Sequence, residues 1–170
     1  PEPVSLDNSF LANRTRQVWL PSSVLTIRDG TPAIAPQGTN TRYRAYAFDA
    51  AAVESLVGDW VLPQDFVSTL AFNIVWTNLG AGAGDVVWRV IASTRSDAAD
   101  LNAAAEFDTS DTITAPAQDI LKVSTHTVAV TGTLGQVVQF IIVRMGTDAA
   151  DTLANDAGLL GLSLSWTADM

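Results

Sequence analysis

The sequence contains no cysteine, and this absence removes several kinds of structure and chemistry at once. Disulfide bonds, cysteine-ligated zinc sites and thiol nucleophiles are all excluded. Stability must therefore come from packing and from backbone hydrogen bonds. Hydrophobic residues make up 48% of the 170 residues, which is enough for a buried core, and a chain of this length fits one domain.

Basic residues are scarce. Nine lysines and arginines stand against 18 aspartates and glutamates, for a formal net charge of −9. Nucleic-acid binding is therefore not expected, because phosphate contacts need a basic surface. Residues 1–44 carry five arginines and three acidic residues, whereas residues 45–170 carry four basic and fifteen acidic residues. A mildly basic leading segment thus precedes a strongly acidic body.

Long apolar runs are also missing. No run approaches the ~20 residues that a membrane-spanning helix needs. The first four residues, Pro-Glu-Pro-Val, lack the charged and apolar regions of a signal peptide. We therefore expect no membrane partner and no export signal.

The hydrophobic pattern of residues 42–170 predicts an all-β fold. Apolar and polar side chains alternate at 69–77, 86–92 and 160–166, as in strands with one buried face. Further strands are expected at 42–49, 53–62, 120–130 and 136–145. The last of these is apolar on both faces, so we place it centrally in a sheet. About eight short strands without interleaved helices predict a sandwich or a barrel.

The leading residues 1–41 are predicted to form an extended arm and a loop, outside a domain that spans 42–170. Residues 1–16 show no periodicity, and residues 28–41 are rich in Gly, Pro, Thr and Asn. Between them, short strands are expected at 18–20 and 24–27.

One short helix is expected at Asp97–Glu106, where alanine is frequent and Ser96 is a suitable N-cap. At about ten residues it is predicted to lie in a loop rather than to form a layer of the fold.

A catalytic site is not apparent. His126 is the only histidine, so a Ser-His-Asp triad would have to use it. It is expected in the middle of a strand, on a solvent-exposed face with Lys122 and Ser124. The sequence has no Gly-x-Ser-x-Gly elbow. We therefore predict that the protein is not an enzyme.

The carboxylates gather in two segments. Calcium binds several oxygen ligands from one loop, but neither spacing matches an EF-hand. A carboxylate pair on a cleft could instead hydrolyse glycosides. We interpret both groups as solvated turns and expect no cofactor or metal, with calcium left as an open alternative. The groups are Asp97, Asp100, Glu106, Asp108 and Asp111, and Asp148, Asp151 and Asp156.

Five tryptophans raise the question of sugar stacking. Trp60, Trp76, Trp88 and Trp166 lie in phase with Leu, Phe or Val, so packing in the core explains them more simply. Trp19 lies outside that pattern. For Trp19 a docking anchor and a core residue remain open alternatives.

The stretch from Tyr43 to Trp166 resembles jelly-roll β-sandwich domains of virion proteins in tailed bacteriophages. The resemblance implies an antiparallel jelly-roll β-sandwich that is commonly trimeric and not catalytic. Such domains occur as capsid decoration (cement) proteins, head fibres and tail parts. The residues that carry the resemblance are Trp60–Phe66, Phe72–Thr77, Val86–Val90 and Asp151–Leu162.

The expected function is therefore a capsid decoration protein that binds the major capsid protein as a homotrimer on the virion surface. Made in the host bacterial cytoplasm, it would need no disulfides. Arginines suit this contact because their planar forks bind carboxylates. The expected partner-binding residues are Arg14, Arg16, Trp19, Arg28, Arg42 and Arg44. The alternative is a tail or fibre module that binds a receptor or carbohydrate on an exposed aromatic platform; a glycoside hydrolase ranks last.

Overall fold

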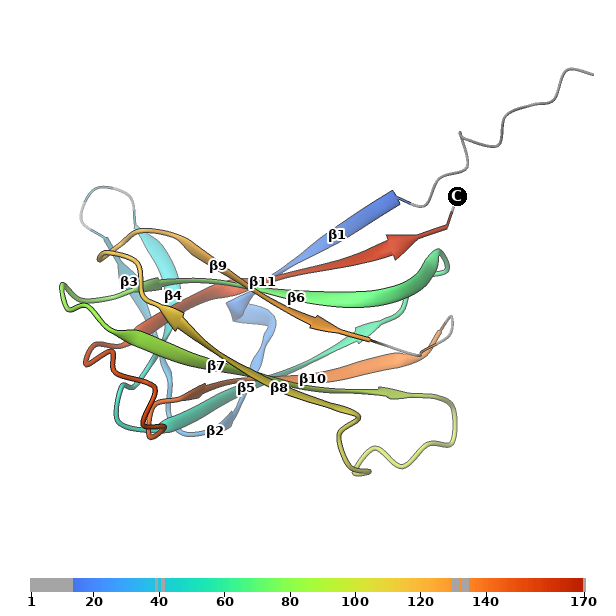
Figure 1. Ribbon diagram of the computed structural model, residues 1–170. Coiled ribbons are helices and arrows are strands. Elements are labelled where there is room, and N and C mark those ends of the chain that lie inside the picture. The colour runs from blue at the N-terminus through green and yellow to red at the C-terminus, as the bar shows by residue number, and fades with distance from the viewer. Residues whose placement is uncertain (1–13, 39, 41, 130–131, 133–134, 170) are drawn as a thin grey trace, which may run out of the picture.

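The protein folds into two antiparallel β-sheets packed face to face (Figure 1). The computed structural model describes residues 14–38, 40, 42–129, 132 and 135–169. Their elements are β1 (Arg14–Pro21), the 3-10 helix η2 (Ser22–Val24), β2 (Thr26–Asp29), β3 (Ala33–Gln37), β4 (Tyr43–Phe48), β5 (Val53–Val61), β6 (Phe66–Asn78), β7 (Asp85–Arg95), β8 (Phe107–Thr114), β9 (Lys122–Val128), β10 (Val137–Met145) and β11 (Ala157–Ala168). The antiparallel β-sandwich predicted from the sequence is confirmed.

Each sheet has a simple order. One sheet runs β3-β4-β11-β6-β9, with β1 also paired to β11, and the other runs β2-β5-β10-β7-β8. β1 and β4 share one edge of β11, where β1 pairs with residues 161–168 and β4 with residues 157–159. β10 lies at the centre of its sheet, as its apolar faces predicted. Within the described residues, no helix is long and apolar enough to cross a membrane.

The core lies between the two sheets and is rich in aromatic rings. Trp88 meets both Phe48 and Trp76 edge to face, with ring centroids 5.3 and 5.7 Å apart. Trp76, Trp88 and Trp166 are buried, and the ring of the partly buried Trp60 packs at a tilt against Trp166, with centroids 5.0 Å apart. The interpretation of these four tryptophans as packing residues is therefore confirmed.

The leading segment contributes more strand than the sequence predicted. The strand expected at 18–20 lies within β1, the one expected at 24–27 overlaps β2 only in part, and β3 was not expected. Residues 14–16, expected in the arm, begin β1, and much of the expected loop 28–41 lies in β2 and β3. These strands are short and largely exposed, so they lack the alternation that marks a buried face. Pairing with distant strands, β11, β5 and β4, makes them extended. The rest of the predicted arm, residues 1–13, lies outside the described residues.

The predicted helix at Asp97–Glu106 is absent, and turns replace it. The amides of Ala99 and Ala103 donate to the carbonyls of Ser96 and Asp100, each closing a tight turn. The Arg95 guanidinium then donates to the carbonyl of Ala103 at 2.8 Å. A helix of about ten residues is marginal by itself, so these tertiary contacts decide the conformation.

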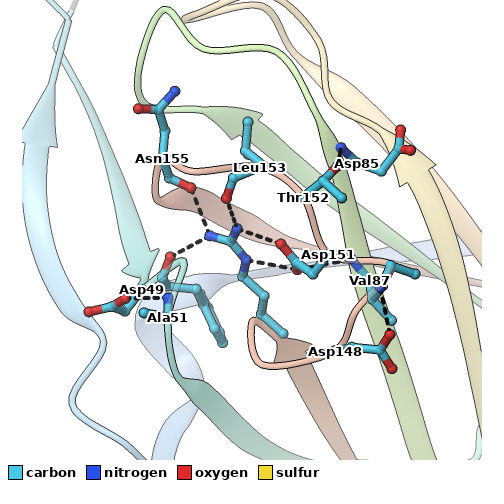
Figure 2. Close-up of polar contacts among 12 residues, drawn as sticks. Asp49, Ala51, Asp85, Val87, Asp148, Asp151, Thr152, Leu153 and Asn155 are labelled. Atoms are coloured by element: carbon cyan, nitrogen blue, oxygen red, sulfur yellow. Dashed lines mark hydrogen bonds and ion pairs between the residues drawn. The ribbon is translucent and has the colours of Figure 1, made fainter.

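A buried ion pair fixes one end of the sandwich. The side chains of Arg144 of β10 and of Asp151 are both fully buried, and Nη2 of Arg144 lies 2.9 Å from Oδ1 of Asp151. The guanidinium also donates to the carbonyls of Phe48, Leu153 and Asn155. Figure 2 shows Asp151, Leu153 and Asn155 converging on this group. Five hydrogen bonds thus use all five N–H donors of the side chain.

Breaking this pair leaves a charge buried without a partner. We expect Arg144→Met to lower the free energy of unfolding by about 3–5 kcal/mol, and Asp151→Asn to lower it comparably. Chemical denaturation followed by tryptophan fluorescence measures the change. The matched control is Arg89→Met, which breaks the partly exposed pair of Arg89 with Asp108 and is expected to cost no more than about 1 kcal/mol. If Arg144→Met and Arg89→Met lowered the free energy of unfolding equally, the stabilising role of the buried pair would be contradicted.

Candidate functional site

The structure disperses the six residues that the sequence assigned to partner binding. Arg14, Arg16 and Trp19 lie on β1, and Arg28 lies on β2 of the other sheet. Arg44 is on β4, with Arg42 just before it. β1 and β4 extend toward opposite ends of the sandwich (Figure 1). In addition, Nε of Arg16 is paired with Asp65 at 2.7 Å.

Trp19 is the exception among the tryptophans, because 49% of its surface is exposed. Its indole lies over Gly161 of β11: a Cβ atom placed on that glycine would come within 2.8 Å of the ring. Only a glycine at this position lets the indole lie so close to the strand. One side of the ring is therefore supported by backbone, while the exposed part is open to solvent.

Strand register places a row of polar side chains beside the indole. Trp19 of β1 is opposite Ser163 of β11, which is opposite Asn73 of β6, which is opposite Thr125 of β9. Asn73, Ser163 and Thr125 alternate with buried neighbours, so they lie on the outer face of the six-stranded sheet. Trp19 is paired to this row and lies between the partly buried Val18 and Leu20, so its side chain is on the same face. The row crosses three inter-strand spacings, about 14 Å. We call these four residues the Trp19 platform.

Hydrogen bonds hold the polar part of the platform in place. The Asn73 amide nitrogen donates to the Ser163 carbonyl at 2.8 Å and to the Ser165 hydroxyl at 3.2 Å. The Asn73 amide oxygen accepts from the Thr125 hydroxyl at 2.7 Å. The Ser163 hydroxyl makes no hydrogen bond among the described residues, so it is available to a ligand. The platform is therefore preorganised, and the Ser163 hydroxyl remains free to hydrogen-bond a ligand.

The two rows of residues that flank the platform carry no charge. The flanking row on one side is Gln17, Ser165, Ala71 and Thr127, and on the other side Pro21, Gly161, Val75 and Val123. In a protein of net charge −9, three adjacent uncharged rows on one sheet face are distinctive. Such a face can approach a neutral, polar surface without desolvating an ion.

His126 is buried, so the prediction that its face is exposed was wrong. Its side chain points between the sheets, and Nδ1 lies 3.2 Å from Oδ2 of Asp111 on β8. Ser124, on the same face, is also buried and accepts a hydrogen bond from Trp76. The sequence argument assumed that the face with polar residues is exposed. In β9, an edge strand, Ser124 and His126 instead point toward the core. Burial lowers the pKa of His126, and Asp111 partly offsets this.

The carboxylate groups are divided among separate partners. Asp108 pairs with Arg89, Asp111 with His126, and Glu106 with the backbone and hydroxyl of Thr94. Asp148 and Asp100 close turns by accepting from nearby amides. Within the part of the chain that the structure describes, no three His, Asp or Glu side chains form a group able to hold a metal ion.

The sequence argument singled out Trp19 but missed Asn73, Ser163 and Thr125. Asn73 and Ser163 lie in the segments 69–77 and 160–166, whose alternation was recognised, and both are on the face opposite the core. The alternation showed that such a face exists, but the register that aligns the three strands depends on long-range pairing. Gly161 was a local signal, as a glycine on the outer face within the alternating run 160–166.

No protein-family model matches the chain, and no curated protein matches it by sequence. Solved structures are similar. They include the family 35 carbohydrate-binding module of Cellvibrio japonicus Abf62 (TM-score 0.51, 12% identity, 91% of this chain and 99% of that chain). A family 35 module from Clostridium thermocellum has a TM-score of 0.51 and 11% identity, over 88% of this chain and 97% of that chain. An isomalto-dextranase of Arthrobacter globiformis T6, complexed with panose, has a TM-score of 0.57 and 13% identity, over 87% of this chain and 23% of that chain.

At these identities the likeness defines the fold alone. The jelly-roll β-sandwich predicted from the sequence is thus confirmed, since the two family 35 modules share it over nearly their whole length. A phage virion origin gains no support from these structures.

The buried histidine makes stability depend on pH. Because burial lowers the pKa of His126 below its usual 6.5, the unfolded chain binds the proton at a higher pH than the folded protein does. We expect stability to fall as pH drops from about 8 to about 5. The free energy of unfolding, measured by urea denaturation at each pH, should lose much of this slope in His126→Gln. An unchanged slope in that variant would contradict the assignment.

Proposed function

We propose that this protein is a non-catalytic carbohydrate-binding module and that the Trp19 platform binds the sugar. The observation that carries the proposal is the exposed indole beside a fixed row of hydroxyl and amide groups. Sugar rings present an apolar face of C–H groups and a rim of hydroxyls. Trp19 provides the stacking surface for that face, while Ser163 and its neighbours provide hydrogen bonds for the rim.

The similar structures support this proposal more than they support a capsid role. Two of them are named as family 35 carbohydrate-binding modules, and another is named as a complex of such a module with a glucuronic acid containing disaccharide. The uncharged face favours a neutral or weakly charged glycan. At about 14 Å, the platform is long enough for a short oligosaccharide rather than a single sugar.

Truncating the indole tests the proposal. We expect Trp19→Ala to weaken binding to the best polysaccharide on a glycan array by about 2 kcal/mol, roughly thirtyfold in Kd, because an aromatic anchor usually supplies much of the binding energy of such a surface. Trp19→Phe, which keeps an aromatic face, should retain part of the affinity. Binding should change little with salt, since the platform is uncharged.

The matched control is Ile34→Ala, which removes an equally exposed apolar side chain on β3, away from the platform. It should bind as the wild type does. Affinity electrophoresis on the same polysaccharide gives all the values. Full binding by Trp19→Ala, or no binding of the wild type to any glycan, would reject the proposal.

Attachment to a larger assembly is a second proposal, and strand β1 is the observation that favours it. Among the described residues β1 pairs only with β11, so its other edge offers backbone groups to a strand from a partner. Arg14 is exposed on this strand and suits an acidic partner. The capsid decoration role, with the major capsid protein as partner, is one form of this proposal.

Self-assembly is the part of this proposal that the protein alone can test. If the predicted homotrimer forms, sedimentation equilibrium should give three times the mass of the 18.0 kDa chain. Arg14→Glu should leave the trimer intact if Arg14 faces the partner rather than a second copy. A monomer at every concentration would exclude the trimer.

A further inference from the structure

A hollow lies on the side of the molecule opposite the Trp19 platform. The outer face of the five-stranded sheet forms its floor, where Val57, Ile141 and Ile91 stand side by side on β5, β10 and β7. The loop of residues 96–106 forms one wall through Leu101 and its neighbours. The cavity has a volume of about 340 Å³. This size is within the usual range for small-molecule sites.

Two arginines line this cavity, and no carboxylate does. Arg28 is half-exposed, and its closest carboxylate oxygen is on Asp29 at 3.6 Å. That oxygen already accepts a hydrogen bond from the Ser55 hydroxyl at 2.9 Å. Nε of Arg28 thus faces Asp29 in a loose ion pair, but among the described residues the side chain makes no hydrogen bond, so its two terminal nitrogens are free for a ligand. This is unexpected in a chain of net charge −9.

Arg95, the second arginine, builds the wall rather than contacting a ligand directly. Its side chain is only 7% exposed, and its terminal nitrogens donate to the carbonyls of Thr94, Ala103 and Ala104. Glu106 lies 3.5 Å from it. Arg95 thus holds the loop against the sheet, and its Nε remains buried without a partner. It is a positioning residue.

Three uncharged polar side chains complete the lining. Ser93, Asn102 and Gln139 face the cavity, and their side chains make no hydrogen bonds among the described residues. A neighbouring cavity of about 560 Å³ shares Gln139 and is lined by Asp59 and Asp97. These two carboxylates disfavour a second negative charge on a ligand that extends in that direction.

We propose that this cavity binds a small organic acid with one carboxylate and several hydroxyl groups. Arg28 takes the carboxylate in a two-point hydrogen bond, since the guanidinium fork matches its geometry. Gln139, Asn102 and Ser93 bind the hydroxyls, and the apolar floor contacts the carbon skeleton. This site does not depend on the proposed function of the Trp19 platform.

Titration by NMR tests the site with defined probes. Gluconate, added to the labelled wild-type protein, should shift the amide signals of β5, β7, β10 and the loop 96–106. Sorbitol, which has similar hydroxyls and no carboxylate, should shift them far less. Arg28→Ala should weaken gluconate binding about tenfold or more. Arg28→Lys keeps the charge but loses the planar fork, so its affinity for gluconate should lie between those of the wild type and Arg28→Ala.

Two variants serve as controls. Arg42→Ala removes an exposed arginine outside the cavity and should bind gluconate normally. Trp19→Ala should also bind it normally, so that failure of one site is separable from failure of the other. The proposal is overturned if gluconate shifts none of these signals, if Arg28→Ala binds as the wild type does, or if sorbitol or inorganic phosphate binds as tightly as gluconate.

Discussion

The buried pair of Arg144 and Asp151 is the interaction on which the arrangement of the sandwich depends. A fully buried guanidinium is costly unless its donors find acceptors, and here the acceptors come from β4 and from the segment between β10 and β11. Asp151 also accepts from the amide of Val87, at 3.1 Å, and so reaches β7. One ion pair therefore joins the two sheets at the end where β11 begins (Figure 2).

The sequence could not reveal this pair. Arg144 appears there as a lone charge at the end of an apolar run, and its partner lies in a loop that has no periodicity. What the sequence did reveal was the alternation itself: Leu70, Phe72, Ile74 and Trp76 are all fully buried, as their spacing predicted. Period two separates two faces but does not say which one is inside. His126 was therefore assigned to the wrong face, because polar neighbours usually mark the surface.

The candidate sites were predictable to different degrees. Trp19 stood out because it fitted no buried pattern, and its exposure agrees with that. The packing of its indole could not be predicted from β1, whose residues show no alternation. It depends on Gly161 of β11, more than a hundred positions away in the sequence. Arg28 was expected to contact a partner along with five other residues, yet it lies in the other sheet from Trp19. Such groupings come from long-range pairing, which residue types alone do not define.

Both sites follow from a general property of a two-sheet sandwich. Each strand gives alternate side chains to the shared core and to one outer face, so the outer faces can vary while the core is kept. β11 illustrates this, with Leu162 and Leu164 fully buried and Ser163 and Ser165 on the other side. Substitutions on one outer face should therefore be nearly additive with those on the opposite face, because a packed core separates them. An uncharged platform and an arginine-lined cavity can thus coexist in one strongly acidic domain without either constraining the other.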